Sequence, residues 1–164
     1  MTNQNCRMFC TTLLRLRILV GATFILLIML PRISIAAAFC SITSLSAVDF
    51  GTYNVFSAQS NNNGVGNVTI QCQNGPPTFV VNLSRGQSNS YISRVMKSAG
   101  NTLNYNLYTS AARIVVWGDG TGGSSTMSVN RNSTTTISVF GQIPAGQDAA
   151  VGAYTDNITT TINF

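Results

Sequence analysis

Apolar and polar side chains alternate in short segments along most of the chain after residue 40. Five segments carry the pattern, at residues 66–72, 78–83, 103–109, 136–143 and 157–164. Successive side chains point to opposite faces of a β-strand, so this alternation is typical of strands that bury one face. No stretch after residue 40 keeps a helical period. The pattern therefore predicts an all-β domain.

The predicted inward faces are apolar, and the connections between them are rich in turn residues. The inward positions are Val68, Ile70, Cys72, Phe79, Val81, Leu83, Leu103, Tyr105, Leu107, Ile137, Val139, Ile143, Ile158, Thr160, Ile162 and Phe164. Glycine, asparagine, serine and proline dominate residues 60–66 and 74–77, and these residues favour tight turns. Several short strands joined in this way indicate a β-sandwich or a barrel.

The first segment of the chain is predicted to lie outside this domain. Three arginines precede an apolar run at residues 18–30, which has the length of a signal-peptide core. Ala36 and Ala38 then occupy the positions that signal peptidase reads. We expect a signal peptide at residues 1–38 and one mature domain at residues 39–164. The alternative is an uncleaved anchor, which the short run disfavours because a membrane span needs about 20 apolar residues.

Removal of the leader changes the charge of the chain. The whole sequence has a formal net charge of +5, and a basic chain invites a nucleic-acid interpretation. Four of the nine cationic residues lie in the leader, so the mature part keeps five against four aspartates, a net charge of +1. The sequence therefore predicts neither a nucleic-acid partner nor a membrane span after cleavage.

The four cysteines divide evenly between the leader and the domain. Cys6 and Cys10 lie in the leader, whereas Cys40 and Cys72 remain in the mature chain. An even pair in an exported chain predicts one disulfide. The alternative is a metal site, which lacks ligands because the chain has no histidine and no further cysteine after the leader. We expect a Cys40–Cys72 disulfide, no bound metal and no cofactor.

The residues that enzymes use for proton transfer and nucleophilic attack are scarce. The sequence contains no histidine, no glutamate and a single lysine, Lys97. General acid–base and nucleophilic catalysis depend on such groups. Two aspartates could meet in space as a glycosidase pair, but nothing in the pattern places any two together. The sequence predicts a protein that is not an enzyme and has no catalytic residue.

The stretch VVWGDGTGG, at residues 115–123, joins the only tryptophan to a glycine-rich loop with one acidic residue. A phosphate loop needs a lysine and a calcium loop needs several carboxylates, and neither is present here. We interpret the stretch as a structural hairpin turn made of Trp117, Gly118, Asp119 and Gly120. The tryptophan is then expected to cover the end of the sandwich. A contact to a metal ion or a sugar is the alternative.

Several stretches occur together, in order, in one known family. They are FCSITSLSAVDFGTYN at 39–54, VTIQC at 68–72, LNYNLYTSAAR at 103–113, WGDG at 117–120, VFGQIPAGQ at 139–147 and GAYTDNITTTINF at 152–164. Together they resemble the spore coat protein U domain family, which includes pilin subunits of the archaic, Csu-type chaperone–usher pathway. The resemblance covers essentially all of residues 40–164.

The resemblance implies an incomplete immunoglobulin-like β-sandwich that lacks its final strand. A periplasmic chaperone fills the gap with its own strand, and the N-terminal extension of another pilus subunit replaces that strand at an outer-membrane usher. The implied acceptor groove is bordered by Ile158, Thr160, Ile162 and Phe164. The carboxylate of Phe164 matches the group that basic chaperone residues grip. The implied route is through the periplasm to a fimbrium at the cell surface.

The pattern itself supports an open edge. The alternation at residues 157–164 runs to the end of the printed sequence, and no turn or partner strand follows. An apolar edge left open must be covered, because exposed edges aggregate. From the pattern alone, the alternative is an internal strand that is paired on both sides. We expect the open edge.

A shaft subunit also needs a donor extension before its first cysteine. Cleavage after Ala38 leaves only Phe39 there, which is too short to span a groove. We therefore expect a subunit that accepts a strand without donating one, as at the tip of a fibre.

The resemblance thus implies a structural pilus subunit that serves adhesion or biofilm formation. The alternative is an exported lectin-like adhesin, or a spore-coat-like module that is not polymerised, with contacts from Trp117 and from tyrosines such as Tyr91.

Overall fold

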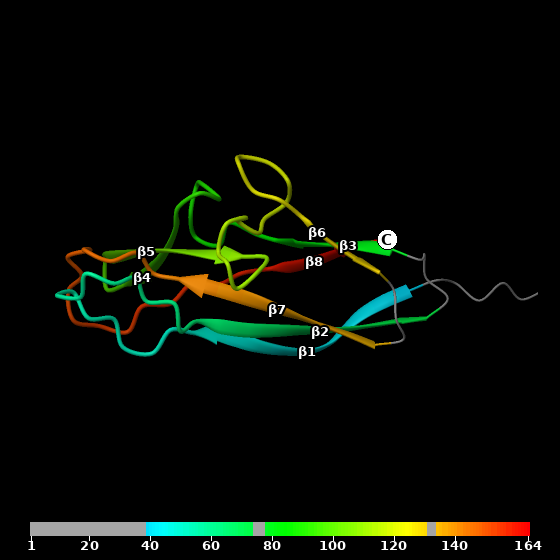
Figure 1. The fold of residues 1–164 in the computed structure, drawn as a ribbon, viewed down its shortest axis with the longest axis horizontal. Helices are drawn as coiled ribbons and strands as arrows, with labels where there is room; N and C mark the ends of the chain where they lie inside the picture. Colours follow the sequence, from blue (N-terminus) through cyan, green and yellow to red (C-terminus); the bar gives the residue numbers. More distant parts are fainter. Residues whose placement is uncertain (1–38, 74–77, 131–133) are drawn as a thin grey trace, which may run out of the picture. The chain divides into compact units, whose positions relative to one another are not determined.

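The computed structural model describes residues 39–73, 78–130 and 134–164, and these residues form eight β-strands (Figure 1). The strands are β1 (Phe39–Asp49), β2 (Val65–Gln73), β3 (Thr78–Leu83), β4 (Arg94–Ser98), β5 (Asn101–Tyr108), β6 (Met127–Asn130), β7 (Thr134–Gln142) and β8 (Thr160–Asn163). The predicted all-β class is confirmed. In these ranges no helix has the length and apolarity that crossing a membrane requires. The predicted signal peptide at residues 1–38 lies outside the described residues.

The strands form two sheets. The five-stranded sheet has the order β1-β2-β7-β5-β4, and the three-stranded sheet has the order β6-β3-β8. Every ladder in both sheets is antiparallel. Neighbours such as β2 and β7 are far apart in the sequence, because the chain passes repeatedly from one sheet to the other. This arrangement is an immunoglobulin-like sandwich, as predicted.

The inward faces of the two sheets meet in one apolar core. All predicted inward positions on β2, β3, β5 and β7, together with Ile143 just beyond β7, are buried. Phe50, Met96 and Trp117 complete the core from a loop, from β4 and from an irregular segment. Burial of one side chain of this size stabilises the fold by about 1.5–3 kcal/mol, so the core supplies the main driving force for folding.

Three strands have no counterpart among the predicted segments: β1, β4 and β6. β1 is long, but two irregularities interrupt its pairing with β2, between Ile42 and Ser44 and between Ser46 and Asp49. Each irregularity shifts the side chains that face inward, so the alternation in the sequence is broken twice. β4 and β6 are only 5 and 4 residues long, too short to show a clear period.

The final strand is shorter than predicted, because residues 155–160 cross from one sheet to the other. Lys97 of β4 and Thr155 exchange two main-chain hydrogen bonds, with N···O distances of 2.9 and 3.1 Å. Farther along, the Ser84 N–H donates to the Thr159 carbonyl at 2.9 Å, and Thr160 pairs with Leu83 of β3. A regular ladder cannot follow both sheets, so β8 begins only at Thr160.

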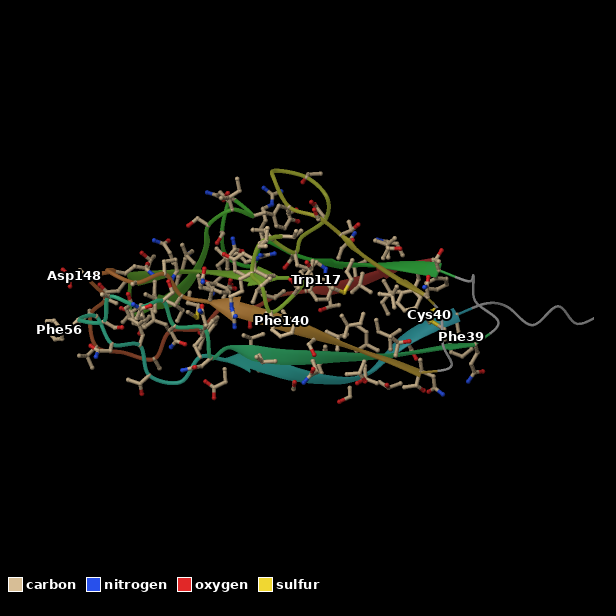
Figure 2. The ribbon with its side chains drawn as sticks, in the orientation of Figure 1. Phe39, Cys40, Phe56, Trp117, Phe140 and Asp148 are labelled. Atoms are coloured by element: carbon tan, nitrogen blue, oxygen red, sulfur yellow. A yellow bond between two sulfur atoms is a disulfide. The ribbon has the colours of Figure 1, made fainter. Side chains whose placement is uncertain are left out.

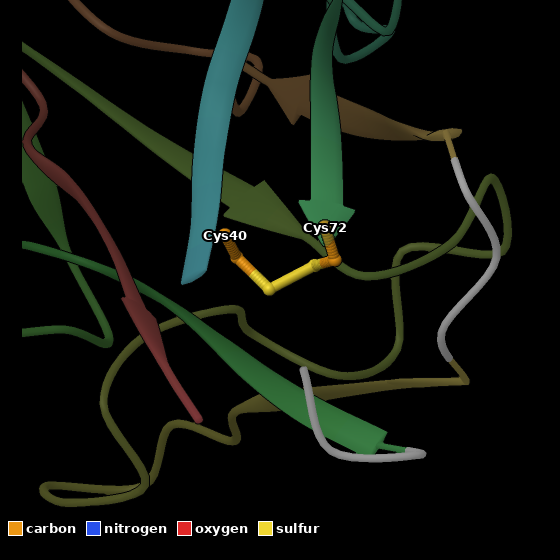
Figure 3. The surroundings of a disulfide bond; sticks show 2 residues. All are labelled: Cys40 and Cys72. Atoms are coloured by element: carbon orange, nitrogen blue, oxygen red, sulfur yellow. A yellow bond between two sulfur atoms is a disulfide. The ribbon is translucent and has the colours of Figure 1, made fainter. Parts of the chain in front are cut away.

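A disulfide joins Cys40 of β1 to Cys72 of β2, as predicted (Figure 3). The two residues face each other in the ladder, with their Cα atoms 4.1 Å apart. The bond closes a loop between positions separated by 32 residues. In the chain-entropy view such a loop stabilises the folded state by about 3–4 kcal/mol. The disulfide therefore fastens the edge strand β1 to the rest of its sheet.

Candidate functional site

An open groove of about 530 Å³ lies between β1 and the segment that leads into β8. One wall is formed by residues 45–48 of β1, and the other by residues 154–160. The floor consists of side chains from the core, namely Phe50, Val68, Leu83, Met96, Tyr105, Leu107 and Val139. We call this feature the edge groove. The inner layer of the sandwich is thus reachable from outside along this line.

Both walls of the edge groove are sheet edges. Within the described residues β1 pairs only with β2, and β8 pairs only with β3. The main-chain groups on the outer side of each strand are therefore free to bind a further strand. The two edges belong to different sheets.

The two edges run in opposite directions. Antiparallel pairing along the five-stranded sheet makes β1 and β4 parallel to each other. The antiparallel bridge between Lys97 and Thr155 sets the last segment against that direction. An added strand must therefore lie parallel to one wall and antiparallel to the other.

The predicted groove residues occupy different places along the last segment. Ile158 and Thr160 are half-buried and line the edge groove. Ile162 is half-buried against the core and pairs with Val81 in the ladder between β3 and β8. Phe164 is 56% exposed and lies outside the groove lining. A bordering role for Ile162 and Phe164 stays a prediction.

The opposite wall went unpredicted. Leu45 is 61% exposed, and Val48 packs partly on the core. The sequence feature that could have indicated this wall is the run of small and apolar residues LSAV at 45–48. It stands directly before Asp49-Phe50-Gly51, where the strand ends. The irregular pairing of β1 hides its period.

The edge groove contains one carboxylate, that of Asp156. Its Oδ2 accepts a hydrogen bond from the Tyr105 hydroxyl at 2.7 Å. Its Oδ1 accepts the main-chain N–H groups of Gln87 at 2.9 Å and of Asn157 at 2.8 Å. Burial, and then the hydrogen bond to Asp156, raises the pKa of Tyr105, so its hydroxyl stays protonated and donates.

Arg94 of β4 is a fully buried cation. Its Nε and Nη2 both donate to the Ser84 carbonyl, at 3.1 and 2.9 Å. Nη1 donates to Asn106 Oδ1 at 2.7 Å, and Nη2 also donates to the Trp117 carbonyl at 2.6 Å. Burial lowers the pKa of Arg94. The guanidinium therefore links three chain segments that have no direct ladder between them.

The WGDG segment connects the two sheets. The Trp117 N–H donates to the Leu107 carbonyl of β5 at 2.9 Å, and the Gly118 carbonyl accepts from Leu83 of β3 at 3.2 Å. The Asp119 carboxylate accepts the main-chain N–H and the hydroxyl of Thr121, at 2.9 and 2.6 Å, and these bonds lower its pKa. The segment is thus a structural bend.

Two details of the WGDG prediction are wrong. The bend is no hairpin, because Trp117 and Ser125 form a parallel bridge. Trp117 does not cover the end of the sandwich, since it is completely buried, with its indole Nε1 donating to the Val81 carbonyl at 2.8 Å. Figure 2 shows Trp117 in the middle of the domain. Trp117 therefore anchors the chain inside the domain, at the point where the chain passes between the two sheets.

The surface contacts predicted for a binding module are also misplaced. Trp117 is buried, and Tyr91 is only 6% exposed because Arg85 and Arg94 lie against its ring. The two most exposed large apolar side chains among the described residues are instead Phe56, at 94%, and the fully exposed Val151. Both line a second hollow, of about 770 Å³, and Figure 2 shows Phe56 at the opposite end of the domain from Cys40. Among the described residues, no group of His, Cys, Asp or Glu side chains could hold a metal ion.

Comparison with known proteins agrees with the predicted resemblance. The family model described as the Spore Coat Protein U domain matches residues 29–161. Protein U of Myxococcus xanthus is 29% identical over 140 residues, which cover 76% of this chain and 77% of that protein.

A solved structure shares the fold. It is the pre-assembly complex of the chaperone CsuC and the tip adhesion subunit CsuE, from the archaic chaperone–usher Csu pili of Acinetobacter baumannii. The TM-score is 0.56 at 22% identity, over 78% of this chain. The match spans only 40% of that chain. At this identity the likeness shows a common fold.

Proposed function

The chain belongs to the Spore Coat Protein U domain family, and we propose that it is a structural pilus subunit whose edge groove accepts a β-strand from another protein. The family is one of structural domains, which confirms the prediction that the chain is not an enzyme. Assembly by strand addition uses two free sheet edges and an apolar floor. The edge groove has both.

The observation that carries this proposal is an open groove, lined by core side chains, between two free sheet edges. Core side chains of β2, β4, β5 and β7 form the floor of the edge groove, and in a complete sandwich a further strand would close this opening. An added strand would cover this floor with alternate side chains. Its main-chain groups would pair with β1 and β8, which gives affinity, while the side-chain pockets give specificity.

The partners follow from the same geometry. We propose that a periplasmic chaperone fills the edge groove first, and that the extension of another subunit replaces it at an outer-membrane usher. The solved relative of Acinetobacter baumannii was captured as a complex with its chaperone, which supports the first step. This route requires export, so we retain the signal peptide at residues 1–38 and the mature domain at residues 39–164 as proposals. The disulfide is compatible with an oxidising compartment.

Co-purification from the periplasm tests this function. The full chain is expressed with and without a chaperone of the chaperone–usher class, and its yield and binding are measured. We expect a one-to-one complex and a higher yield with the chaperone. A stable monomer that ignores the chaperone contradicts the proposal.

The position of the subunit in the fibre can be tested with the same protein purified from the periplasm. We propose a tip position, because cleavage after Ala38 leaves no donor extension. Sequencing of the mature N-terminus should begin at Phe39. A start well upstream of Ala36 would show an extension long enough to donate, and would contradict the tip position.

A second candidate function is that of an exported binding module, favoured by the exposed Phe56 and Val151. Exposed aromatic and aliphatic side chains on loops are common contact points. A Phe56→Ser, Val151→Ser double variant should then lower adhesion to an apolar surface without changing chaperone binding. Gln59→Ser, in the same loop as Phe56, is the control. Unchanged adhesion in the double variant contradicts this function.

A further inference from the structure

The wall of the edge groove at residues 155–160 has no continuous ladder of its own. It pairs with β4 at Thr155 and with β3 from Thr159 onward, and changes sheets in between. Between Thr155 and Thr159 no regular ladder sets the register of this segment, so its register is weakly specified by main-chain pairing alone. A slide by one residue would turn Ile158 and Thr160 away from the groove, so something must hold the crossing in place.

Side-chain hydrogen bonds hold the crossing from both ends. At one end, Asp156 binds the Tyr105 hydroxyl and the Gln87 N–H, and Gln87 Nε2 donates to the Thr155 carbonyl at 3.3 Å. At the other end, the Thr159 N–H donates to Ser84 Oγ at 2.9 Å. Both sets of bonds reach the short segment 84–88. The crossing is therefore clamped against a single loop.

The loop is shaped for this carboxylate. Gly86 has a positive φ of 64°, and a Cβ there would collide with the Asp156 carboxylate. Arg94 fixes the same loop from the inner side through its two bonds to the Ser84 carbonyl. The loop and the floor residue Tyr105 thus meet at Asp156, which is the one side chain of the wall that bonds to both.

We propose that Asp156 is the positioning residue of the edge groove, setting the register in which an incoming strand is bound. This inference rests on the proposed function of the groove. Through Tyr105 the carboxylate ties the wall to the floor, and through Gln87 it ties the wall to the 84–88 loop. With the wall fixed, Ile158 and Thr160 face the groove, and an added strand finds one set of pockets.

Two substitutions separate this role from a general loss of folding. Tyr105→Phe removes one hydroxyl and keeps the ring, whose edge packs on Phe50 at a centroid distance of 5.8 Å. Asp156→Ala removes the bonds of the carboxylate to Tyr105 and Gln87, whereas Asp156→Asn keeps an amide that can still bond to the Tyr105 hydroxyl. Tyr108→Phe is the matched control, since that hydroxyl on the same strand binds Gln142 Oε1 outside the groove. Thermal unfolding verifies that each variant folds.

The test measures where a strand binds as well as how tightly. The probe is a fluorescent 12-residue peptide in which valine alternates with threonine. A bromoacetyl group is placed at successive positions of the peptide. The full chain carries Thr160→Cys as its reactive thiol, together with Cys6→Ser and Cys10→Ser, while Cys40 and Cys72 stay joined in the disulfide. Each peptide reports its distance from the wall by the rate of coupling, which gives the register directly.

With the otherwise native chain we expect one peptide position to couple fastest. Tyr105→Phe and Asp156→Ala should bind the peptide about tenfold more weakly and couple at several positions. Asp156→Asn should retain the single register, and Tyr108→Phe should match the native chain. A single, unchanged register in Tyr105→Phe or Asp156→Ala overturns the role of Asp156. A native chain that captures no peptide contradicts instead the proposed function of the groove.

Discussion

Trp117 satisfies its polar groups while lying completely inside the apolar core. Its indole N–H, its main-chain N–H and its carbonyl bind Val81, Leu107 and Arg94 respectively. A buried polar group without a partner costs about 1–3 kcal/mol, so each lost bond would reduce the contribution of this residue to stability. The tryptophan is therefore a structural anchor between the sheets.

Replacement of Trp117 by phenylalanine should destabilise the protein. The buried Val81 carbonyl loses its donor, and a cavity appears beside it, so we expect the free energy of unfolding to fall by at least about 1–3 kcal/mol. Urea unfolding measures the change. The control is Ile114→Ala, an exposed position, where we expect less than about 0.5 kcal/mol. An equal effect at both positions would rule out the anchoring role.

Tyr105 predicts a loss of stability in alkaline solution. Burial and the bond to Asp156 raise its pKa in the folded state, whereas in the unfolded chain the pKa is about 10. The contribution of Tyr105 to the free energy of unfolding is therefore complete below pH 10. It declines as the pH rises further, because the tyrosine of the unfolded state releases its proton first. The slope attributable to Tyr105 is at most about 1.4 kcal/mol per pH unit.

Unfolding free energies measured between pH 8 and pH 11 check this dependence. Tyr105→Phe should show a shallower decline above pH 10 than the native chain. Tyr108→Phe should change the slope less, because Tyr108 is only partly buried. Parallel curves for native and Tyr105→Phe proteins would show that the hydroxyl does not titrate as described.

At the scale of elements, β8 and β1 are the two strands that form the free edges beside the groove. β8 has only 4 residues, yet it forms one edge of the three-stranded sheet. β1 has 11 residues and is mostly exposed, and in addition to its ladder with β2 a disulfide ties it covalently to the domain. Under the proposed function, both edges have to stay in place before a strand is added.

Ile162→Asp should abolish strand capture. The side chain faces the core from β8, and a carboxylate there would be desolvated without a partner. Thr161→Asp, on the exposed face of the same strand, is the control. Capture of the alternating peptide, or co-purification with the chaperone, should be lost only in the first variant. Equal capture by both variants would exclude β8 as the binding edge.

Removal of the disulfide should loosen the other edge. The Cys40→Ala, Cys72→Ala double variant is expected to lose about 3–4 kcal/mol of unfolding free energy, because the loop is no longer closed in the unfolded chain. Denaturant unfolding of protein isolated from the periplasm measures the loss. Native protein in reducing buffer should behave like the double variant. No difference between oxidised and reduced protein would contradict this contribution.

The elements that could be predicted from the sequence are those with one uninterrupted buried face. β2, β3, β5 and β7 pair regularly, and so their alternation survives in the sequence. β1 could not be found in this way, since its irregular pairing with β2 breaks the period. The start of β8 was misplaced for a related reason, because hydrogen bonds from side chains, which leave no periodic signal, fix the crossing at residues 155–159.

At the scale of the whole molecule, the described domain is a sandwich with its inner layer open along one side. The wall at Ile158 and Thr160 could be anticipated from the last alternating segment. The wall on β1, the floor residue Met96 and the clamp at Asp156 required the fold, because residues distant in the sequence build them. The chemistry of the groove is therefore set by topology more than by any local motif.

Amide hydrogen exchange of the full chain, with and without the alternating valine–threonine peptide, tests the edge groove most directly. The proposed function predicts that the peptide slows exchange on both walls, at residues 45–48 of β1 and at residues 158–162 around β8, and leaves the outer edge of β4 unchanged. Unchanged exchange at both walls, or protection confined to another surface, would contradict strand addition at this groove.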